Sequence, residues 1–313
     1  MKLQQLRYLC EISNQDLNLS KAAKKLHTSQ PGISKQIQLL EEELKVKIFI
    51  RNGKRLVKIT PPGEAILKIA ERMMQDTENL KRISQEFTHE AGGTLTIATT
   101  HTQARYVLPA VIKRFTARYP DVKLILRQGS PTQISTLVTS GEADIAIATE
   151  AIELFHELVM LPCYEWNRCI IVPPTHPLLE LKELTLEAIA QYPIITYDFA
   201  FTGRSKINQA FESRQLSPNV VLTAIDSDVI KTYVELGLGI GILAKMAFDP
   251  KRDKHLRSID ASHLFESSTT RIGISRNSYL RSYIFDFIEM FAPHLSEATI
   301  RTALQKHLER QKP

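Results

Sequence analysis

The stretch from Leu19 to Leu44 constrains the fold of this chain more than any other. Ser20 is placed to cap a short apolar-faced helix, and Ser29 to cap a second helix with Pro31 in its first turn. In the second helix apolar residues recur at i, i+4, i+7 and i+11, which predicts one buried stripe: Ile33, Ile37, Leu40 and Leu44. Two short helices separated by a tight polar break predict a helix-turn-helix, with residues 29–44 as its second helix.

The opposite face of that second helix carries small, polar and basic side chains, with no acid before Glu41. Such a face suits the floor of a DNA major groove, although a helical hairpin with a solvated outer face has the same pattern. The side chains expected to contact DNA from this motif are Ser20, Ser29, Gln30, Pro31, Ser34, Lys35 and Gln38.

Charge favours the DNA interpretation. Residues 1–60 hold twelve Lys or Arg and five Asp or Glu, a net charge of +7, whereas the whole chain carries +6. The remaining residues therefore sum to −1. Basicity confined to the segment that holds the helix-turn-helix is typical of a phosphate-binding surface.

A hairpin is predicted directly after this motif. Two β-type runs, 48–50 and 56–59, flank the sequence Arg-Asn-Gly-Lys-Arg, and Asn-Gly between such runs is a strong hairpin signal. The module is therefore predicted to be winged, with Arg51, Lys54 and Arg55 at the wing tip. We expect these cations to contact phosphates or the minor groove, the alternative being a solvated turn.

A long helix is expected from Thr60 to Phe87. Its residues Ile66, Ala70, Met73, Thr77, Leu80, Ser84 and Phe87 alternate at spacings of four and three, which suits a helix–helix dimer contact. The alternative is an amphipathic helix lying on its own domain. With a break at 91–93, the expected domains are a DNA-binding domain 1–60, a linker and dimerisation helix 61–90, and an α/β domain 91–313.

Strands alternate with helices from Thr94 onward, which predicts parallel sheets covered on both sides. About 200 residues of this pattern exceed one small sheet, so we expect two lobes with a cleft between them. Lobe I is expected at about 91–161 and 269–293, and lobe II at about 162–268. Residues 296–311 are expected to form an exposed polar helix.

Composition excludes several classes of protein. The N-terminus lacks the apolar core of a signal peptide and no window reaches a membrane span, so a cytoplasmic protein without membrane contact is expected. Three scattered cysteines and nine histidines show no metal-ligand spacing. Gly237–Gly241 falls between a helix and a strand, the wrong context for a dinucleotide loop. No catalytic motif, cofactor or metal site is predicted.

Three clusters of hydroxyl residues follow predicted strands. Thr100, Thr102 and Gln103 follow the first strand, Thr149 follows a later one, and Thr202 precedes a helix. Ligands of open α/β sheets bind at strand carboxyl ends beside helix N-termini, which suits a small anion or carboxylate. Each threonine taken alone is more often a cap that satisfies its own backbone.

The span from Leu19 to Leu67, LSKAAKKLHTSQPGISKQIQLLEEEL followed by IFIRNGKRLVKITPPGEAIL, resembles the N-terminal signature of LysR-type transcriptional regulators. The remainder is similar to their effector domain, which has the periplasmic-binding-protein fold. The stretches TTHTQARYVLP, GEADIAIATE, YDFAFTGR and GLGIGILA resemble the CysB/Cbl branch, regulators of cysteine biosynthesis and sulfur assimilation. One departure is Lys45, where the family often has glycine after the leucine.

This resemblance implies an effector pocket built from Thr100, Thr102, Gln103, Thr149 and Thr202. It implies promoter DNA and RNA polymerase as partners, a homotetramer, and N-acetylserine, O-acetylserine, sulfate or a similar metabolite as effector. The alternatives are a LysR-type regulator of another pathway with a different small anionic effector, an exported solute receptor, and an architectural DNA binder without a ligand.

Overall fold

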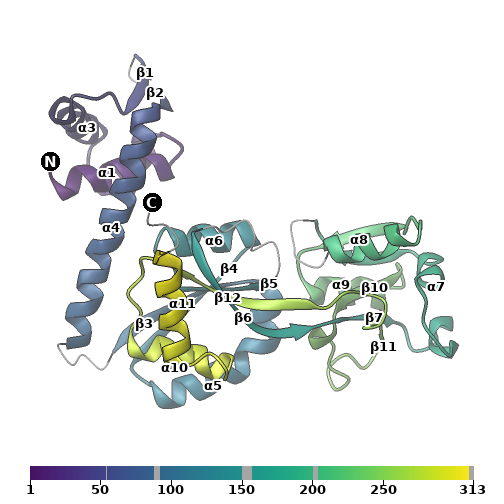
Figure 1. The fold of residues 1–313 in the computed structure, drawn as a ribbon. Helices are drawn as coiled ribbons and strands as arrows, with labels where there is room; N and C mark the ends of the chain where they lie inside the picture. The colour runs from purple at the N-terminus through teal and green to yellow at the C-terminus, as the bar shows by residue number, and fades with distance from the viewer. Residues whose placement is uncertain (54, 88–91, 150–156, 200–203, 310–313) are drawn as a thin grey trace. The chain divides into compact units, whose positions relative to one another are not determined.

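The computed structural model describes residues 1–53, 55–87, 92–149, 157–199 and 204–309 (Figure 1). Two predicted site residues, Lys54 and Thr202, lie outside the described residues, as does Ala91 at the expected domain boundary. The chain divides into two compact units, Met1–His89 with Asn277–Tyr279, and Glu90–Arg276 with Leu280–Pro313.

Three helices form the core of the first unit: α1 (Leu3–Asn14), α2 (Leu19–Lys25) and α3 (Gln30–Leu44). The predicted stripe of α3 is confirmed, because Ile33, Ile37 and Leu40 are fully buried and Leu44 packs against the same cluster. The hydroxyl of Ser29 accepts a hydrogen bond from the Gly32 N–H at 3.2 Å, so the predicted cap of α3 is confirmed, with Pro31 in the first turn.

The predicted cap of α2 is wrong. Ser20 is already the second residue of that helix, and Asn18 caps it. The Asn18 side-chain oxygen accepts hydrogen bonds from the N–H groups of Ser20 and Lys21 at 3.1 and 3.0 Å. Asparagine caps at least as well as serine and its side-chain carbonyl accepts from two N–H groups here, so the helix begins two residues earlier than the apolar pattern indicates.

The wing hairpin is confirmed. Strand β1 (Phe49–Asn52) pairs antiparallel with β2 (Arg55–Ile59), and Gly53 in the turn has a φ of +59°. Asn52 ends β1 and pairs with Arg55, and Gly53 follows it with the positive φ that glycine adopts without steric cost. The register shifts between Ile50 and Arg51, a bulge that changes the direction of the side chains beyond it.

Helix α4 (Pro61–Phe87) follows the wing. Its first half packs on α1, with Ala70 buried and Ile66, Leu67 and Met74 against the same core. Ile69, Met73 and Leu80 are exposed and form an apolar stripe. The predicted dimer seam is therefore divided: Ala70 belongs to the core of its own unit, as the alternative interpretation expects, while Met73 and Leu80 face outward.

The second unit contains two five-stranded sheets. Lobe I has the strand order β4-β3-β5-β12-β6, and lobe II the order β11-β7-β10-β8-β9. The strands of lobe I are β3 (Gly93–Thr99), β4 (Val122–Gln128), β5 (Ile145–Thr149), β6 (Leu158–Trp166) and β12 (Ser268–Ser275). Those of lobe II are β7 (Arg168–Val172), β8 (Ile194–Tyr197), β9 (Val220–Ala224), β10 (Ile240–Ala244) and β11 (Arg257–Asp260).

Both sheets are mixed rather than parallel as expected. Strands β12 and β7 run antiparallel to their neighbours, whereas β3, β4 and β5, and likewise β8, β9 and β10, run parallel. The cause is connectivity, because the chain leaves lobe I through β6 and returns through β12 (Figure 1). Strand β6 continues to Trp166 within the lobe I sheet, four residues beyond the lobe boundary expected at 162.

Helices cover both faces of each sheet. In lobe I, α5 (Leu108–Arg118) and α10 (Ser282–Phe291) pack on one face and α6 (Pro131–Thr139) on the other. Lobe II carries α7 (Leu186–Ala190), α8 (Arg204–Ser213) and α9 (Ser227–Glu235). Short helical segments are η1 (Gln103–Val107), η3 (Pro177–Glu180) and η4 (Lys245–Ala247).

The last helix, α11 (Glu297–Glu309), differs from the exposed helix that was expected. Ile300 is fully buried in the lobe I core, and Ala303 and Leu304 pack against it. A single apolar face was enough to dock a helix whose overall composition is polar. None of the described helices is both long and apolar enough to span a membrane.

Candidate functional site

The outer face of α3 presents the side chains predicted to read DNA. Ser29, Pro31, Lys35 and Gln38 are exposed, and Gln30 and Ser34 are half-buried. They lie opposite the fully buried Ile33, Ile37 and Leu40, because the helix repeats every 3.6 residues. The surface therefore combines a rigid apolar base with a polar, basic outer face.

A hollow of about 520 Å³ adjoins this face. Its lining brings the exposed Ser20 of α2, Gln30 of α3 and Arg55 of the wing together, with residues 16–19 and Leu56. Three separate elements thus supply hydroxyl, amide and guanidinium groups to one concave surface. Such groups are the usual donors to phosphate and sugar oxygens.

The wing cations are not equivalent. Arg55 is exposed, while the Arg51 side chain is 24% exposed and turns toward α3. Arg51 Nη1 donates a hydrogen bond to Ser34 Oγ at 3.3 Å, and Nη2 lies 3.6 Å from Glu41 Oε2. Glu41 is 2% exposed, although the sequence pattern placed it on the outer face of the helix.

In the second unit, four of the five predicted effector residues line one hollow. Thr100, Thr102, Gln103 and Thr149 of lobe I meet there with residues that the sequence did not indicate: Trp166, Tyr197, Ile225 and Ala244. The hollow measures about 30 Å³, room for little more than one water molecule. None of the described residues that line it carries a formal charge.

A chain of side-chain hydrogen bonds joins the lobe I side of this hollow. Gln103 Nε2 donates to Thr270 Oγ1 at 3.1 Å, and the hydroxyls of Thr270 and Thr149 lie 3.3 Å apart. Tyr164 donates to Gln103 Oε1 at 2.5 Å, and Trp166 Nε1 donates to Thr149 Oγ1 at 3.2 Å. Gln103, Thr149 and Thr270 are all buried, so this network fixes their orientations.

The side chains of Thr149 and Thr102 do not act as helix caps, in contrast to the alternative considered for each threonine. The recorded partners of Thr149 are side chains on β6 and β12. Thr102 precedes the π-helical turn η1 and makes no side-chain cap hydrogen bond. Single π-helical turns are frequent at functional sites, where they change the direction of side chains.

Trp166 also connects the hollow to the crossover between lobes. Its ring lies 5.2 Å from the guanidinium of Arg168, which is 1% exposed. Arg168 donates to Glu266 O and Ser268 Oγ, both at 2.9 Å, and so ties the outgoing chain segment to the returning one. Direct contacts therefore link Thr149 through Trp166 and Arg168 to the two chain segments that cross between the lobes.

Lobe II contributes Tyr197 at the end of β8. Its hydroxyl lies 2.6 Å from Ser227 Oγ and accepts a hydrogen bond from the Ala244 N–H at 3.2 Å. Burial raises the pKa of Tyr197, although its hydrogen bonds to Ala244, Ser227 and Thr102 oppose this rise. The phenol is therefore a neutral hydroxyl that faces Thr102 across the lobes.

A buried cation stands at the start of α8. Arg204 is 4% exposed, and its Nε and Nη1 atoms have no hydrogen-bond partner among the residues that the structure describes. Burial lowers the pKa of Arg204, an effect that the charge of Asp198 opposes, and the Phe199 ring lies 5.0 Å away. The sequence pattern alone did not single out this arginine.

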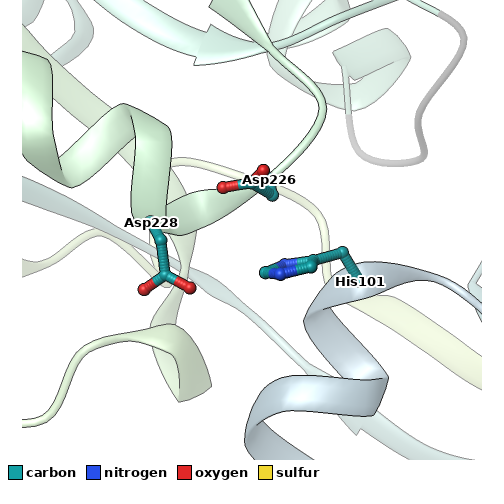
Figure 2. Close-up of side chains that lie close together, drawn as sticks. All are labelled: His101, Asp226 and Asp228. Carbon is teal, nitrogen blue, oxygen red and sulfur yellow. The ribbon is translucent and has the colours of Figure 1, made fainter. Parts of the chain in front are cut away.

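A second cross-lobe cluster joins His101, just before η1, to Asp226 and Asp228 at the start of α9 (Figure 2). One ligand atom from each residue lies within 4.8 Å of the other two. However, Asp226 caps α9 through the Val229 N–H, and Asp228 already contacts Tyr106, Lys231 and Arg105. Burial would raise the pKa of Asp228, but these three neighbours outweigh it and lower the pKa. With two cations already at Asp228, the cluster suits a contact between lobes better than a metal ion.

The geometry thus defines a class of protein: a winged helix-turn-helix unit followed by a two-lobed α/β unit with a hydroxyl-lined hollow between its lobes. Two family models match the corresponding parts of the chain. "Bacterial regulatory helix-turn-helix protein, lysR family" matches residues 3–64, and "LysR substrate binding domain" matches residues 88–296. The chain belongs to the LysR family of transcriptional regulators.

Relatives match it along its whole length. The HTH-type transcriptional regulator SsuR of Burkholderia cenocepacia is 55% identical to this chain, and the match covers 98% of this chain and 99% of SsuR. This chain is 53% identical over 99% of both chains to the HTH-type transcriptional regulator CysB of the same organism. The cofactor-binding domain of the Cbl transcriptional regulator superposes with a TM-score of 0.67 at 46% identity, covering 69% of this chain and 95% of that chain.

Proposed function

We propose that this chain regulates genes of sulfur assimilation and cysteine biosynthesis in response to a small anionic metabolite bound between its two lobes. The observation that carries this proposal is full-length similarity at 53–55% identity to regulators named SsuR and CysB. The four threonine and glutamine residues gathered at one hollow support the same assignment, because they are the residues that the CysB/Cbl resemblance implies.

On the DNA side, the outer face of α3 enters the major groove. Ser34, Lys35, Gln38 and the Gln30-Pro31 end read bases, while Ser20, Ser29 and Arg55 contact the backbone, together with Lys54, which lies outside the described residues. The exposure of Lys35, Gln38 and Arg55 supports this division.

On the effector side, the hydroxyls of Thr100, Thr102 and Thr149 and the Gln103 amide hold oxygen atoms of the ligand, with Thr202 from the opposite lobe. A hollow of about 30 Å³ is smaller than sulfate or an acetylated serine requires, so the lobes must separate to admit either one. The ligand therefore binds the separated and closed arrangements with different affinity, which is the condition for it to shift their populations.

Arg204 supports an anionic ligand. The hollow itself is lined by neutral groups, whereas Arg204 is buried two residues after Thr202 with two nitrogen atoms lacking a partner among the described residues. A guanidinium that retains unused donors in a buried place suits a carboxylate or sulfate oxygen.

The assembly is part of the proposal. The exposed stripe of Ile69, Met73 and Leu80 on α4 pairs two copies, so that two recognition helices meet two half-sites. We further propose that the protein forms a homotetramer, contacts RNA polymerase and acts in the cytoplasm.

The experiment is an electrophoretic mobility shift of a sulfur-assimilation promoter fragment, with and without sulfate, N-acetylserine or O-acetylserine. A shift that one of these ligands alters supports the proposal. Specific DNA binding that responds to none of the three favours the alternative, a LysR-type regulator of another pathway with a different small anionic effector.

A further inference from the structure

Glu41 is the only carboxylate of the described helix-turn-helix segment 19–44 that is fully withdrawn from solvent. Its Oε1 atom accepts hydrogen bonds from the backbone N–H groups of Ile48 and Phe49 at 2.9 and 3.1 Å. Those residues begin the wing, so the Glu41 side chain connects the C-terminal end of α3, the expected recognition helix, to the start of β1.

The second oxygen of Glu41 faces a cation from the wing. Glu41 Oε2 and Arg51 Nη2 are both buried and lie 3.6 Å apart, and neither atom has a hydrogen-bond partner among the described residues. The exposed Lys47 ammonium is slightly farther from the same oxygen, at 3.8 Å. The principal countercharge of this buried carboxylate is therefore Arg51.

The Nη1 atom of Arg51 contacts the outer face of α3, which is proposed to read bases. Arg51 Nη1 donates to Ser34 Oγ at 3.3 Å, so one planar group touches α3 at two points seven residues apart, which are two turns along the helix. The bulge between Ile50 and Arg51 changes the direction of the strand where this contact begins. Only a long, planar, forked cation spans this distance, and lysine lacks that geometry.

We infer that Arg51 and Glu41 form a positioning device for DNA reading: they fix the angle between the wing and the recognition helix and orient the Ser34 hydroxyl toward the bases. Arg51 is then a positioning residue and not a phosphate anchor. This inference rests on the DNA-binding role of the first unit and revises the sequence expectation for Arg51, which treated it like Lys54 and Arg55.

The direction in which DNA affinity changes when the Glu41 charge is removed tests this inference. Glu41→Gln removes a negative charge from a surface that meets a polyanion, so long-range electrostatics alone would strengthen DNA binding. The positioning role requires the opposite, because the neutral amide no longer holds Arg51. The matched control is Glu42→Gln, the exposed neighbour on the same helix, which is expected to leave binding unchanged or slightly tighter.

Salt dependence gives a second test. A residue that neutralises one phosphate lowers the slope of log K against log[salt] by about one. Arg55→Ala is expected to do so. Arg51→Lys keeps the charge but cannot bridge Ser34 and Glu41, so it is expected to weaken promoter binding by about tenfold or more with the slope unchanged.

The experiment measures promoter binding of the full-length chain by fluorescence anisotropy across a salt series, with circular dichroism to verify folding of each variant. Weakened binding by Glu41→Gln and by Arg51→Lys at an unchanged slope supports the inference, and the double variant should be no weaker than the weaker single one. Tighter binding by Glu41→Gln, or wild-type affinity for Arg51→Lys, overturns it. If the wild-type chain does not bind the promoter, the DNA-binding role itself is contradicted. The wild-type and Arg55→Ala measurements test that role independently of Glu41 and Arg51.

Discussion

Trp166 Nε1 donates a hydrogen bond to the Thr149 hydroxyl at 3.2 Å, at the place where the hollow between the lobes meets the crossover from one lobe to the other. Trp166 is the single tryptophan of the chain. Its fluorescence therefore reports on the hollow without labelling, and we expect sulfate or an acetylated serine to change it when the Thr149 hydroxyl exchanges partners.

Thr102→Val is expected to abolish this fluorescence response and the effect of the ligand on promoter binding, while DNA binding without ligand persists. Thr102 lines the hollow and caps no helix, so its loss removes a ligand contact without breaking a recorded backbone hydrogen bond. The loss of one hydrogen bond to a charged ligand corresponds to about a 10–100-fold loss of affinity. The control is Thr116→Val, an exposed threonine on α5 whose hydroxyl donates to the Ile112 and Lys113 carbonyls of its own helix. Collapse of ligand-free DNA binding in a folded Thr102→Val chain would contradict the separation of roles.

Arg204→Met tests the anionic nature of the effector. Because Nε and Nη1 of Arg204 have no partner among the described residues, an apolar replacement is expected to leave thermal stability unchanged or slightly higher. Affinity for sulfate or N-acetylserine, measured by calorimetry, is expected to fall by about tenfold or more.

The matched control for Arg204 is Lys206→Met on the same helix. Lys206 contacts the Ser267 carbonyl and lies 3.3 Å from the Glu266 carboxylate, so its loss is expected to lower stability without changing ligand affinity. If Arg204→Met instead lowered the melting temperature and left the affinity intact, the arginine would be structural.

Lys35→Ala is expected to weaken promoter binding. If Lys35 contacts only a phosphate, the slope of log K against log[salt] falls by about one and all sequences lose affinity alike. If it reads a base, discrimination between promoter and unrelated DNA falls instead. Lys113→Ala, an exposed lysine on α5 in the second unit, is the control and should leave both quantities unchanged. Wild-type affinity for Lys35→Ala would remove α3 from the interface.

Lys45→Gly addresses the one departure from the family pattern. Lys45 ends α3 in the left-handed conformation at φ +55°, which costs a side-chain-bearing residue about 1–2 kcal/mol and glycine much less. We expect a gain of about 0.5–1 kcal/mol in the local stability of residues 30–52, after the entropic cost of glycine. Amide hydrogen exchange of the full chain measures it, and Lys45→Ala, which keeps the strain, should show no gain. Faster exchange in the glycine variant would contradict this account.

The sequence predicted the first unit well because its signals are local. The Ile33, Ile37 and Leu40 stripe, the Ser29 cap and the Asn-Gly turn each depend on residues within one or two turns of the chain. The Asn18 cap was missed because Asn18 and Ser20, two residues apart, are both good capping residues and the apolar pattern does not separate them. The burial of Glu41 depends on the wing strand folding back to supply two N–H groups, which helical periodicity does not reveal.

The lining of the proposed effector hollow was predicted only in part, for a topological reason. Thr100 and Thr102 follow β3 and Thr149 ends β5, two strands that the alternation of strands and helices located correctly. Trp166 and Thr270 lie on β6 and β12, which pair antiparallel across the lobe crossover, and β6 was not expected as a strand. A parallel-sheet interpretation cannot place β12 antiparallel beside β5, with β6 antiparallel beyond it.

We propose above all that the first unit binds duplex DNA and that the second unit binds a small anion that changes the affinity for DNA. The most direct measurement is the affinity of the full chain for a sulfur-assimilation promoter at low salt, titrated with sulfate, N-acetylserine and O-acetylserine. The account predicts specific binding that one of these ligands changes by about 5–150-fold, the usual range of allosteric coupling. A folded chain that does not bind the promoter at low salt would contradict it.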